Sequence, residues 1–446
     1  METDATRTGE TVELLQQLIR NACVNDGTPD SGGEERNADL LRDVLDGAGL
    51  DQESFDSRPG RRSVVARIEG TDPEAPSLCL LGHTDVVPIS PDGWSRDPFG
   101  GELVDGEVWG RGAVDMLNLT SSMAVAFKHL ATEGPRLAGD LVFIGVADEE
   151  AGGTWGAQYL VDHHRDAVQA DYVLTEFGGV PTHTAEGLAL TLSVAEKGLA
   201  WRRLRVAGTP GHGSMPYGTD NALVTAAEVV RRLADYRPRA VIHDLWRRQV
   251  AGLDVDEATR DALLDPDRTW EALDTLPAGQ AGHLHACSHT TFSPNVAHGG
   301  VKTNVIPDEV VIELDVRTLP GETAEDVDAH LAEALGDLAS RVTTEIIHQD
   351  ASTASPIDTP LWDSLEKAML AVYPEATLLP SLVVGGTDAR IYRHIGSVAY
   401  GAGLLSNSVT WEEFRKRFHG HDERVDVESL GLSTQLWIDV AVDLLG

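Results

Sequence analysis

The stretches SLCLLGHTDVV (77–87) and DLVFIGVADEE (140–150) carry the strongest signal for the fold class, because each is an apolar run that ends in polar residues. Shorter runs of the same kind occupy residues 63–70 and 172–176. Segments with amphipathic helical periodicity alternate with them, at residues 11–24, 35–48, 119–133 and 154–164. Strands that alternate with helices favour a mostly parallel central sheet with helices on both faces. We therefore expect an α/β fold.

The middle of the chain follows another pattern. Strand-like segments at 188–208 and 309–319 are each followed by a helical segment, near 219–236 and 323–338. This order is typical of an α+β domain. A polar insertion of low periodicity covers about 238–285.

The α/β pattern returns near the end of the chain. It comprises a helix at 359–373, strand-like segments at 381–386 and 397–403, and a closing helix from about 427. We therefore expect two domains. The first is discontinuous and covers 1–195 and 353–446, and the second is inserted into it and covers 196–352.

The charge balance is strongly acidic, with 72 Asp and Glu residues against 35 Lys and Arg residues and a formal net charge of −37. The acidic residues are spread along the whole chain, and lysine is nearly absent. This distribution resembles that of haloarchaeal proteins, which work in a high-salt cytoplasm where counter-ions screen self-repulsion. A functional acidic patch, for example around GGEERNADLLRDVLDG (32–47), is the alternative. The lack of a basic stripe argues against direct nucleic-acid binding.

The sequence also predicts where the protein works and which metal ligands it has available. No stretch approaches the roughly 20 apolar residues of a membrane span, and the first residues lack the basic and apolar regions of a signal peptide. We therefore expect a cytoplasmic protein that does not bind membranes. Cys23, Cys79 and Cys287 are far apart and fit neither a disulfide framework nor a CxxC zinc site. A metal ion would have to be held by His and carboxylate side chains.

His83 and Asp85 follow the first apolar run, where open α/β sheets place their ligand sites. In an extended strand, residues i and i+2 share a face. His83 can then bind a metal ion while Asp85 accepts its other ring N–H and orients the ring. A structural histidine beside an ordinary turn aspartate is the alternative.

Further carboxylates lie at comparable positions. Asp115 directly precedes a helical segment, so it is either a ligand or a helix cap. Glu149 and Glu150 end an apolar strand, and adjacent buried carboxylates are costly unless a cation or a proton compensates them. A solvated acidic turn is the competing interpretation. Glu176 ends a short apolar strand, and His419 precedes the closing helix.

Together these motifs resemble a known family. In order they are GHTDVVP, W-x-x-DPFGG, GRGAVDM, DEEAGG, TEFGG, GHGSMP, KTNVIPDEVVIELDVR, GGTDAR and HGHDER. The chain is similar to the co-catalytic zinc hydrolases of metallopeptidase family twenty, which includes aminoacylase-1, carboxypeptidase G, acetylornithine deacetylase and succinyl-diaminopimelate desuccinylase. The resemblance covers essentially the whole chain. It implies a zinc-dependent exopeptidase-like catalytic domain with an inserted lid and dimerisation domain.

The resemblance also implies a set of metal ligands. Asp115 would bridge two Zn²⁺ ions, with His83 and Glu176 completing one site and Glu150 and His419 the other. Co²⁺ or Mn²⁺ could replace Zn²⁺ in such a donor set. The family ligand stands four residues before the Glu of the DE pair, here Glu423, which selects His419 over His421.

The remaining roles come from the same resemblance. Glu149 would be the general base, with Asp85 as the partner of the ligand histidine. His212 would reach the oxyanion, usually from the partner subunit of a homodimer. Asn304, Arg317 and Arg390 would bind the free carboxylate of a small substrate, although a strand-edge salt bridge is the alternative for Arg317.

The chain departs from the family pattern in two places. Leu117 and Asn118 follow the GRGAVDM motif, where Lys-Gly is usual. The insertion at 238–285 is longer than in the compact members.

The resemblance implies hydrolysis of the amide bond of an N-acyl amino acid or a small peptide with a free carboxylate. Deacylase, dipeptidase and carboxypeptidase activities remain open. A zinc aminopeptidase is an alternative, but single-domain aminopeptidases lack the inserted domain with its GHGSMP and NVIP motifs. A non-catalytic binding homologue is another, but it would be expected to have lost Glu149 or a ligand, and none is missing.

Overall fold

The computed structural model describes residues 3–184 and 187–446 and divides into two units. Among the described residues, the first unit comprises 3–184, 187–194, 355–381 and 387–446, and the second comprises 195–354 and 382–386. These units differ from the predicted domains mainly at residues 382–386, where the carbonyl of Val383 accepts the N–H of Lys197 at 3.0 Å. The sequence of a short strand-like segment such as 382–386 does not indicate the unit to which the segment belongs.

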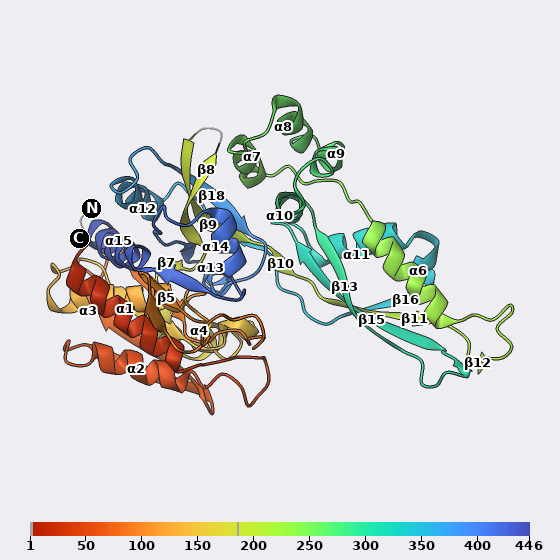
Figure 1. The fold of residues 1–446 in the computed structure, drawn as a ribbon, viewed down its shortest axis with the longest axis horizontal. Coiled ribbons are helices and arrows are strands. Elements are labelled where there is room, and N and C mark those ends of the chain that lie inside the picture. Colours follow the sequence, from red (N-terminus) through yellow and green to blue (C-terminus); the bar gives the residue numbers. More distant parts are fainter. Residues whose placement is uncertain (1–2, 185–186) are drawn as a thin grey trace. The chain divides into compact units, whose positions relative to one another are not determined.

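A mixed sheet forms the centre of the first unit (Figure 1). Its neighbouring strands, in order, are β1 (Asp51–Arg58), β2 (Arg61–Ile68), β6 (Leu141–Val146), β3 (Leu78–His83), β7 (Tyr172–Thr175), β19 (Val398–Gly401) and β9 (Gly187–Glu196). Strands β8 (Gly178–Thr184) and β18 (Thr377–Val383) pair with β9.

The four central strands run parallel. Leu78 of β3 lies opposite both Leu141 of β6 and Tyr172 of β7, and Val398 of β19 also lies opposite Tyr172. Because these strands are parallel and in register, their carboxyl ends meet at one edge of the sheet. The outer pairs β1–β2, β2–β6 and β8–β9 are antiparallel. The predicted α/β class with a mostly parallel centre is confirmed.

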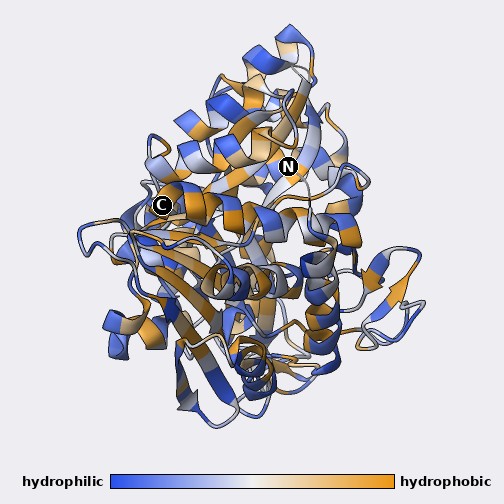
Figure 2. Cartoon of the chain, turned by 90° about the vertical axis from the view of Figure 1, so that its left-hand side faces the viewer, coloured by the Kyte–Doolittle hydropathy of each residue, from blue (hydrophilic) through white to orange (hydrophobic). Residues whose placement is uncertain are grey.

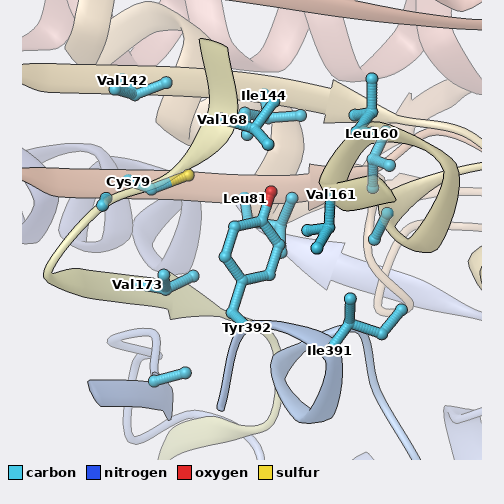
Figure 3. Packing of buried hydrophobic residues seen from close by; sticks show 14 of the residues in the cluster. Cys79, Leu81, Val142, Ile144, Leu160, Val161, Val168, Val173, Ile391 and Tyr392 are labelled. Atoms are coloured by element: carbon cyan, nitrogen blue, oxygen red, sulfur yellow. The ribbon is translucent and has the colours of Figure 1, made fainter. Parts of the chain in front are cut away.

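Helices cover both faces of this sheet. Their bounds are α1 (Ala5–Arg20), α2 (Glu35–Leu45), α3 (Leu117–Thr132), α4 (Ala157–His163), α5 (Arg165–Val168), α12 (Pro360–Leu370), α13 (Ala389–His394) and α15 (Val427–Leu445). Alternate residues of β3 and β6 point to opposite faces. Leu81 and Ile144 therefore pack with Leu160 and Ile391 of α4 and α13 (Figure 3). The central strands β3 and β6 are buried along their whole length and consist mainly of hydrophobic residues, and hydrophobic strands lie in the interior of the molecule in Figure 2.

Helix α3 packs on the other face of the sheet. Phe127 of α3 lies against Phe143 of β6, with ring centroids 5.8 Å apart. A Cβ atom at Gly82 would lie 2.5 Å from the Thr120 hydroxyl, so only glycine permits this approach. Thr120 in turn donates its hydroxyl hydrogen to the carbonyl of His83 at 2.7 Å. This contact fixes the end of β3.

A small antiparallel sheet joins distant parts of the first unit. It consists of β4 (Glu102–Val104), β5 (Glu107–Trp109) and β20 (Arg424–Asp426). Arg424 pairs with Trp109 across β20 and β5. The segment after α14 (Trp411–Arg417) is thereby held beside the segment that leads into α3.

The second unit contains a separate antiparallel sheet. Strand β15 (Glu309–Thr318) pairs with β10 (Gly198–Leu199), β11 (Arg202–Ala207) and β13 (Thr291–Gly299), and β11 pairs with β16 (Val342–Ile346). Buried side chains alternate along β15 and pack against α6 (Ala222–Asp235) and α11 (Ala324–Leu335). Smaller pairings join β12 (Gly211–His212) to β14 (Val305–Ile306), and β17 (Thr353–Ala354) to the end of β9.

The insertion at 238–285 is more regular than the sequence indicated. It forms α7 (Asp244–Ala251), α8 (Glu257–Leu263), α9 (Thr269–Leu273) and α10 (Ala278–Ser288). These helices enclose the fully buried Trp246, whose indole N–H donates to the Leu263 carbonyl at 2.8 Å. Helices α7, α8 and α9 are only 5 to 8 residues long, and α10 buries residues only near its C-terminal end, so the apolar periodicity of the segment is weak. Across the described residues, no helix is both long and apolar enough to cross a membrane.

Candidate metal centre

The carboxyl ends of the parallel strands bring the first group of predicted ligands together. His83 is the last residue of β3, and Glu176 directly follows β7. His83 Nε2 lies 3.1 Å from Asp115 Oδ1 and 3.7 Å from Glu176 Oε2. One ligand atom from each residue falls within 4.8 Å of the others. These three residues could hold one metal ion.

Asp115 also belongs to a second group. Its other oxygen, Oδ2, lies 2.8 Å from His419 Nε2, which in turn is 3.5 Å from Glu150 Oε2. These three residues could also hold a metal ion. His421 instead lies with its ring edge-on to Trp94, at a centroid distance of 6.3 Å. The structure thus brings His419, and not His421, into contact with Asp115.

The side chains of the centre carry an excess of negative charge that a cation would compensate. Burial raises the pKa of Glu176 well above its usual value, and desolvation does the same for the partly buried Glu149. Burial by itself would lower the pKa of His419, but hydrogen bonds to Asp115 and Glu150 raise it to about 10. The Oε1 atom of Glu150 is buried without a hydrogen-bond partner among the described residues. This donor set fits a pair of divalent cations.

Asp85 holds the turn that carries the two adjacent glutamates. Its carboxylate accepts the backbone N–H groups of Glu149 at 3.2 Å and of Glu150 at 3.1 Å. His83 Nδ1 lies 3.0 Å from the Asp85 carbonyl but 3.6 Å from its carboxylate. The sequence predicted that the Asp85 carboxylate would accept the ring N–H of His83. The carboxylate instead accepts the two backbone N–H groups of the turn after β6, because these lie closer to it.

A buried network behind Asp85 was missed by the sequence analysis. The Asn25 amide donates to Asp85 at 2.8 Å and to Asp148 at 3.3 Å. Arg61 donates to Asn25 at 2.8 Å and pairs with both Glu34 and Asp148. All five residues are at most 2% exposed. Burial also raises the pKa of Glu34 to about 7.

Glu423 supports the segment that carries Asp115. One of its oxygens accepts the Arg111 guanidinium at 2.6 Å. The other accepts backbone N–H groups at 2.7–3.1 Å from Gly112, Val114 and Asp115. Met116 occupies the N-cap position of α3 and no side-chain hydrogen bond caps the helix, so the alternative that Asp115 is a simple cap is wrong. In the sequence, Glu423 serves only as the reference position from which His419 is chosen, although its place in the DE pair is a possible signal of this role.

Three of the predicted substrate-side residues lie in the second unit. His212, in the short strand β12, is exposed, and its Nδ1 lies 2.7 Å from the Ser214 hydroxyl. Asn304 is exposed, and its carbonyl accepts the N–H of Gly213 at 2.9 Å. Arg317 forms a two-pronged ion pair with Asp315, at 2.8 and 3.2 Å. The alternative of a strand salt bridge is thus observed for Arg317.

Arg390 lies in the first unit, close to the candidate metal centre. It is 7% exposed and donates to the carbonyls of Thr387 and Gly152, each at 2.7 Å. Gly152 belongs to the turn that follows Glu149 and Glu150. Arg390 therefore braces this turn.

Comparisons with known proteins agree with this geometry. The model of peptidase family M20/M25/M40 matches residues 79–443. The chain belongs to this family and is a metallohydrolase of the metallopeptidase and aminoacylase type.

Two relatives illustrate the range of the family. Human aminoacylase-1 is 26% identical over 419 residues, which cover 93% of this chain and 90% of that protein. The N-fatty-acyl-amino acid synthase/hydrolase PM20D1 of Xenopus tropicalis is 27% identical over 396 residues, which cover 85% of this chain and 75% of that protein.

Solved structures share the fold. The M20 metallo-carboxypeptidase Sso-CP2 of Sulfolobus solfataricus has a TM-score of 0.70 at 17% identity, covering 98% of this chain and 99% of that one. Human carnosine dipeptidase 1 has a TM-score of 0.69 at 16% identity, covering 98% and 96%.

The buried network yields a test that does not depend on turnover. Asn25→Ala removes the amide that joins Asp85 to Asp148, and we expect the affinity for divalent metal to fall about 10- to 100-fold. Competition with a chromophoric chelator measures this affinity. Asn295→Ala, at an exposed position of the second unit, is the matched control. An Asn25→Ala protein that is folded and binds metal as tightly as the parent contradicts the positioning role.

Proposed function

We propose that this chain is a two-zinc hydrolase that cleaves the amide bond of N-acyl amino acids or of small peptides with a free carboxylate. The proposal rests on two groups of His and carboxylate residues that have Asp115 in common, and on Glu149, which lies in the adjoining turn. Aminoacylase-1 and PM20D1, which match most of the chain, support this substrate class. The presence of every expected group argues against a non-catalytic homologue.

Each part of the centre has a proposed role. His83, Asp115 and Glu176 would hold one Zn²⁺ ion, and Asp115, Glu150 and His419 the other. The ions would supply a Lewis acid for the scissile carbonyl and lower the pKa of a bound water. Glu149 would accept a proton from the attacking water and deliver it to the leaving amine. Asp85 supports this role because it fixes the backbone N–H of Glu149.

The carboxylate of the substrate would be bound by Asn304 and Arg317. A guanidinium group binds a carboxylate through two parallel hydrogen bonds. Arg317 already makes such a pair with Asp315, so the substrate would share or displace that partner. Arg390 would contribute mainly by bracing the turn at Gly152.

The second unit would also form a homodimer and supply His212 to the partner's active site. Large apolar side chains are exposed in this unit, including Met215 at 69%, Tyr217 at 99% and Val301 at 93%. Exposed apolar groups of this kind mark interaction surfaces. Tyr217 and Met215 lie within five residues of His212. A dimer built on this surface would carry His212 with it.

Replacing the proposed base tests the mechanism. Glu149→Gln preserves the size of the side chain but cannot accept a proton, so we expect kcat to fall by at least about 100-fold with metal content unchanged. Hydrolysis of N-acetyl amino acids and dipeptides, followed by release of the free amino acid, measures the effect. Glu271→Gln, an exposed glutamate outside the centre, should behave like the parent. Unchanged kcat in Glu149→Gln rules out the proposed role.

Mixing two inactive variants tests whether His212 acts across a dimer. His212→Ala and Glu149→Ala subunits each lack one group, but a mixed dimer would contain one site with both. We expect activity to return to at most about one quarter of the parent level after random exchange of subunits. A mixture that stays inactive, although exchange is shown by mass spectrometry, refutes action in trans.

The acidic composition supports a protein adapted to a high-salt cytoplasm. The acidic side chains behind the net charge of −37 repel one another. Salt shortens the range of this repulsion from about 10 Å at 0.1 M to about 3 Å at 1 M. We expect the Tm to rise by at least about 10 °C between 0.2 and 3 M KCl. Sucrose at matched osmolality controls for excluded volume. A Tm that is constant or falls with KCl contradicts this adaptation.

A further inference from the structure

The two groups that share Asp115 hold their histidines in different ways. His83 is 1% exposed, and its Nδ1 lies 3.0 Å from the carbonyl of Asp85, which orients the ring. The ring of His419 is 45% exposed, and within the described ranges no hydrogen bond to its Nδ1 is found. A ligand histidine is normally oriented by a partner on its second ring nitrogen. The orientation of His419 therefore depends on another kind of contact.

Two aromatic rings supply that contact. The ring of Phe418 packs against the ring of His419, with centroids 4.9 Å apart and an interplanar angle of 31°. The ring of Phe177 packs on Phe418, also at a centroid distance of 4.9 Å. Both distances lie in the range of favourable aromatic contacts. Because Phe177 directly follows Glu176, this row of rings connects the ligand-bearing segments of the two metal groups.

The backbone of Phe177 has a conformation that bulky residues rarely adopt. Its φ is +71°, in the left-handed region that favours glycine. The Ser193 hydroxyl donates to the Phe177 carbonyl, and the following residue, Gly178, pairs with Leu192 of β9. Such strain persists only where the surrounding structure enforces it, and it is concentrated at functional sites. Phenylalanine at a position that suits glycine indicates that its ring has a use.

We propose that Phe177 is a positioning residue, whose ring supports Phe418 against His419 and thereby sets the metal affinity of the group that contains His419. This inference rests on the proposed two-metal function and adds a determinant of it. An exposed ring without support samples several rotamers, and ordering it on metal binding costs entropy. A ring that is already held by Phe418 avoids most of this cost. Phe177 therefore acts through its neighbour and touches neither metal nor substrate.

The other metal group should not depend on Phe177. The Thr120 hydroxyl donates to the carbonyl of His83 at 2.7 Å, and the ring of His83 is oriented by Asp85. The backbone of Glu176 is held by β19, because a Cβ atom on Gly401 would lie 1.8 Å from the Glu176 carbonyl oxygen. These supports remain when the ring of Phe177 is removed. The His83 group should therefore bind the tighter ion in the parent and in the variants.

Stepwise metal binding tests this selectivity. Metal-free protein is titrated with Zn²⁺ against a chromophoric chelator, which resolves a tighter and a weaker ion. His419→Ala, which should lose the weaker step, assigns that step to its group. Phe177→Ala removes the ring, and we expect the affinity for the weaker ion to fall about 10-fold while that for the tighter ion stays unchanged. Phe55→Ala is the matched control, because Phe55 is also half-buried and packs on a histidine outside both groups, His164, at 4.2 Å.

A glycine variant separates the ring from the backbone strain. Glycine adopts a positive φ without a penalty, whereas alanine does not. We expect Phe177→Gly and Phe177→Ala to lose the same affinity for the weaker ion, but metal-free Phe177→Gly to have the higher Tm. If Phe177→Ala does not fold, the glycine variant alone carries the affinity test. A purely structural role predicts a lower Tm with unchanged affinity.

A double-mutant cycle tests whether the two rings act in series. Phe418→Ala should weaken the binding of the second ion at least as much as Phe177→Ala does. If Phe177 acts through Phe418, the double variant should lose no more affinity than Phe418→Ala alone.

The outcomes separate this inference from the proposed function. Unchanged affinity for the weaker ion in both Phe177 variants overturns the inference, and so does an equal loss for both ions. Losses that multiply in the double variant contradict the action through Phe418. A parent that takes up no metal ion refutes instead the two-metal hydrolase function itself.

Discussion

The convergence of buried carboxylates on Asp115 is the constraint on which the rest of the structure depends. Asp115 lies against His83 with one oxygen and against His419 with the other, and Glu176 and Glu150 complete the two groups that share it. Carboxylates this close repel each other and are poorly solvated, so the arrangement is stable only with added positive charge. The raised pKa values of Glu176 and His419 reflect the same poor solvation and nearby negative charge. Two divalent cations would supply this positive charge.

The fold holds these groups in place by short polar contacts at the ends of strands. The Thr120 hydroxyl donates to the carbonyl of His83, and the Asp85 carboxylate accepts the backbone N–H of Glu149. The Glu423 carboxylate accepts backbone N–H groups of the segment before α3. Arg61 lies behind Asp85 and offsets part of the buried negative charge. Removing one partner from such a network leaves an uncompensated buried charge. The metal centre and its supports therefore form one electrostatic unit.

Sequence patterns predicted those parts of this unit that follow from local order. Apolar runs that end in His83, Glu150 and Glu176 predict parallel strands whose carboxyl ends meet, and the structure brings these side chains together. The contacts of Asn25 and Arg61 arise only from tertiary packing across 27 to 123 residues of separation, so no local sequence pattern predicts them. Helices α7 to α10 carry little apolar periodicity, since three of them are 5 to 8 residues long and α10 buries residues only near its C-terminal end.

The metal stoichiometry of two matched variants tests the central claim most directly. Inductively coupled plasma mass spectrometry of dialysed protein should find two metal ions per chain in the parent. His419→Ala, which affects one group, should retain about one ion, and Asp115→Ala, which affects both, should retain none. Two ions in Asp115→Ala, or a parent without metal that stays fully active after chelation, would contradict the account.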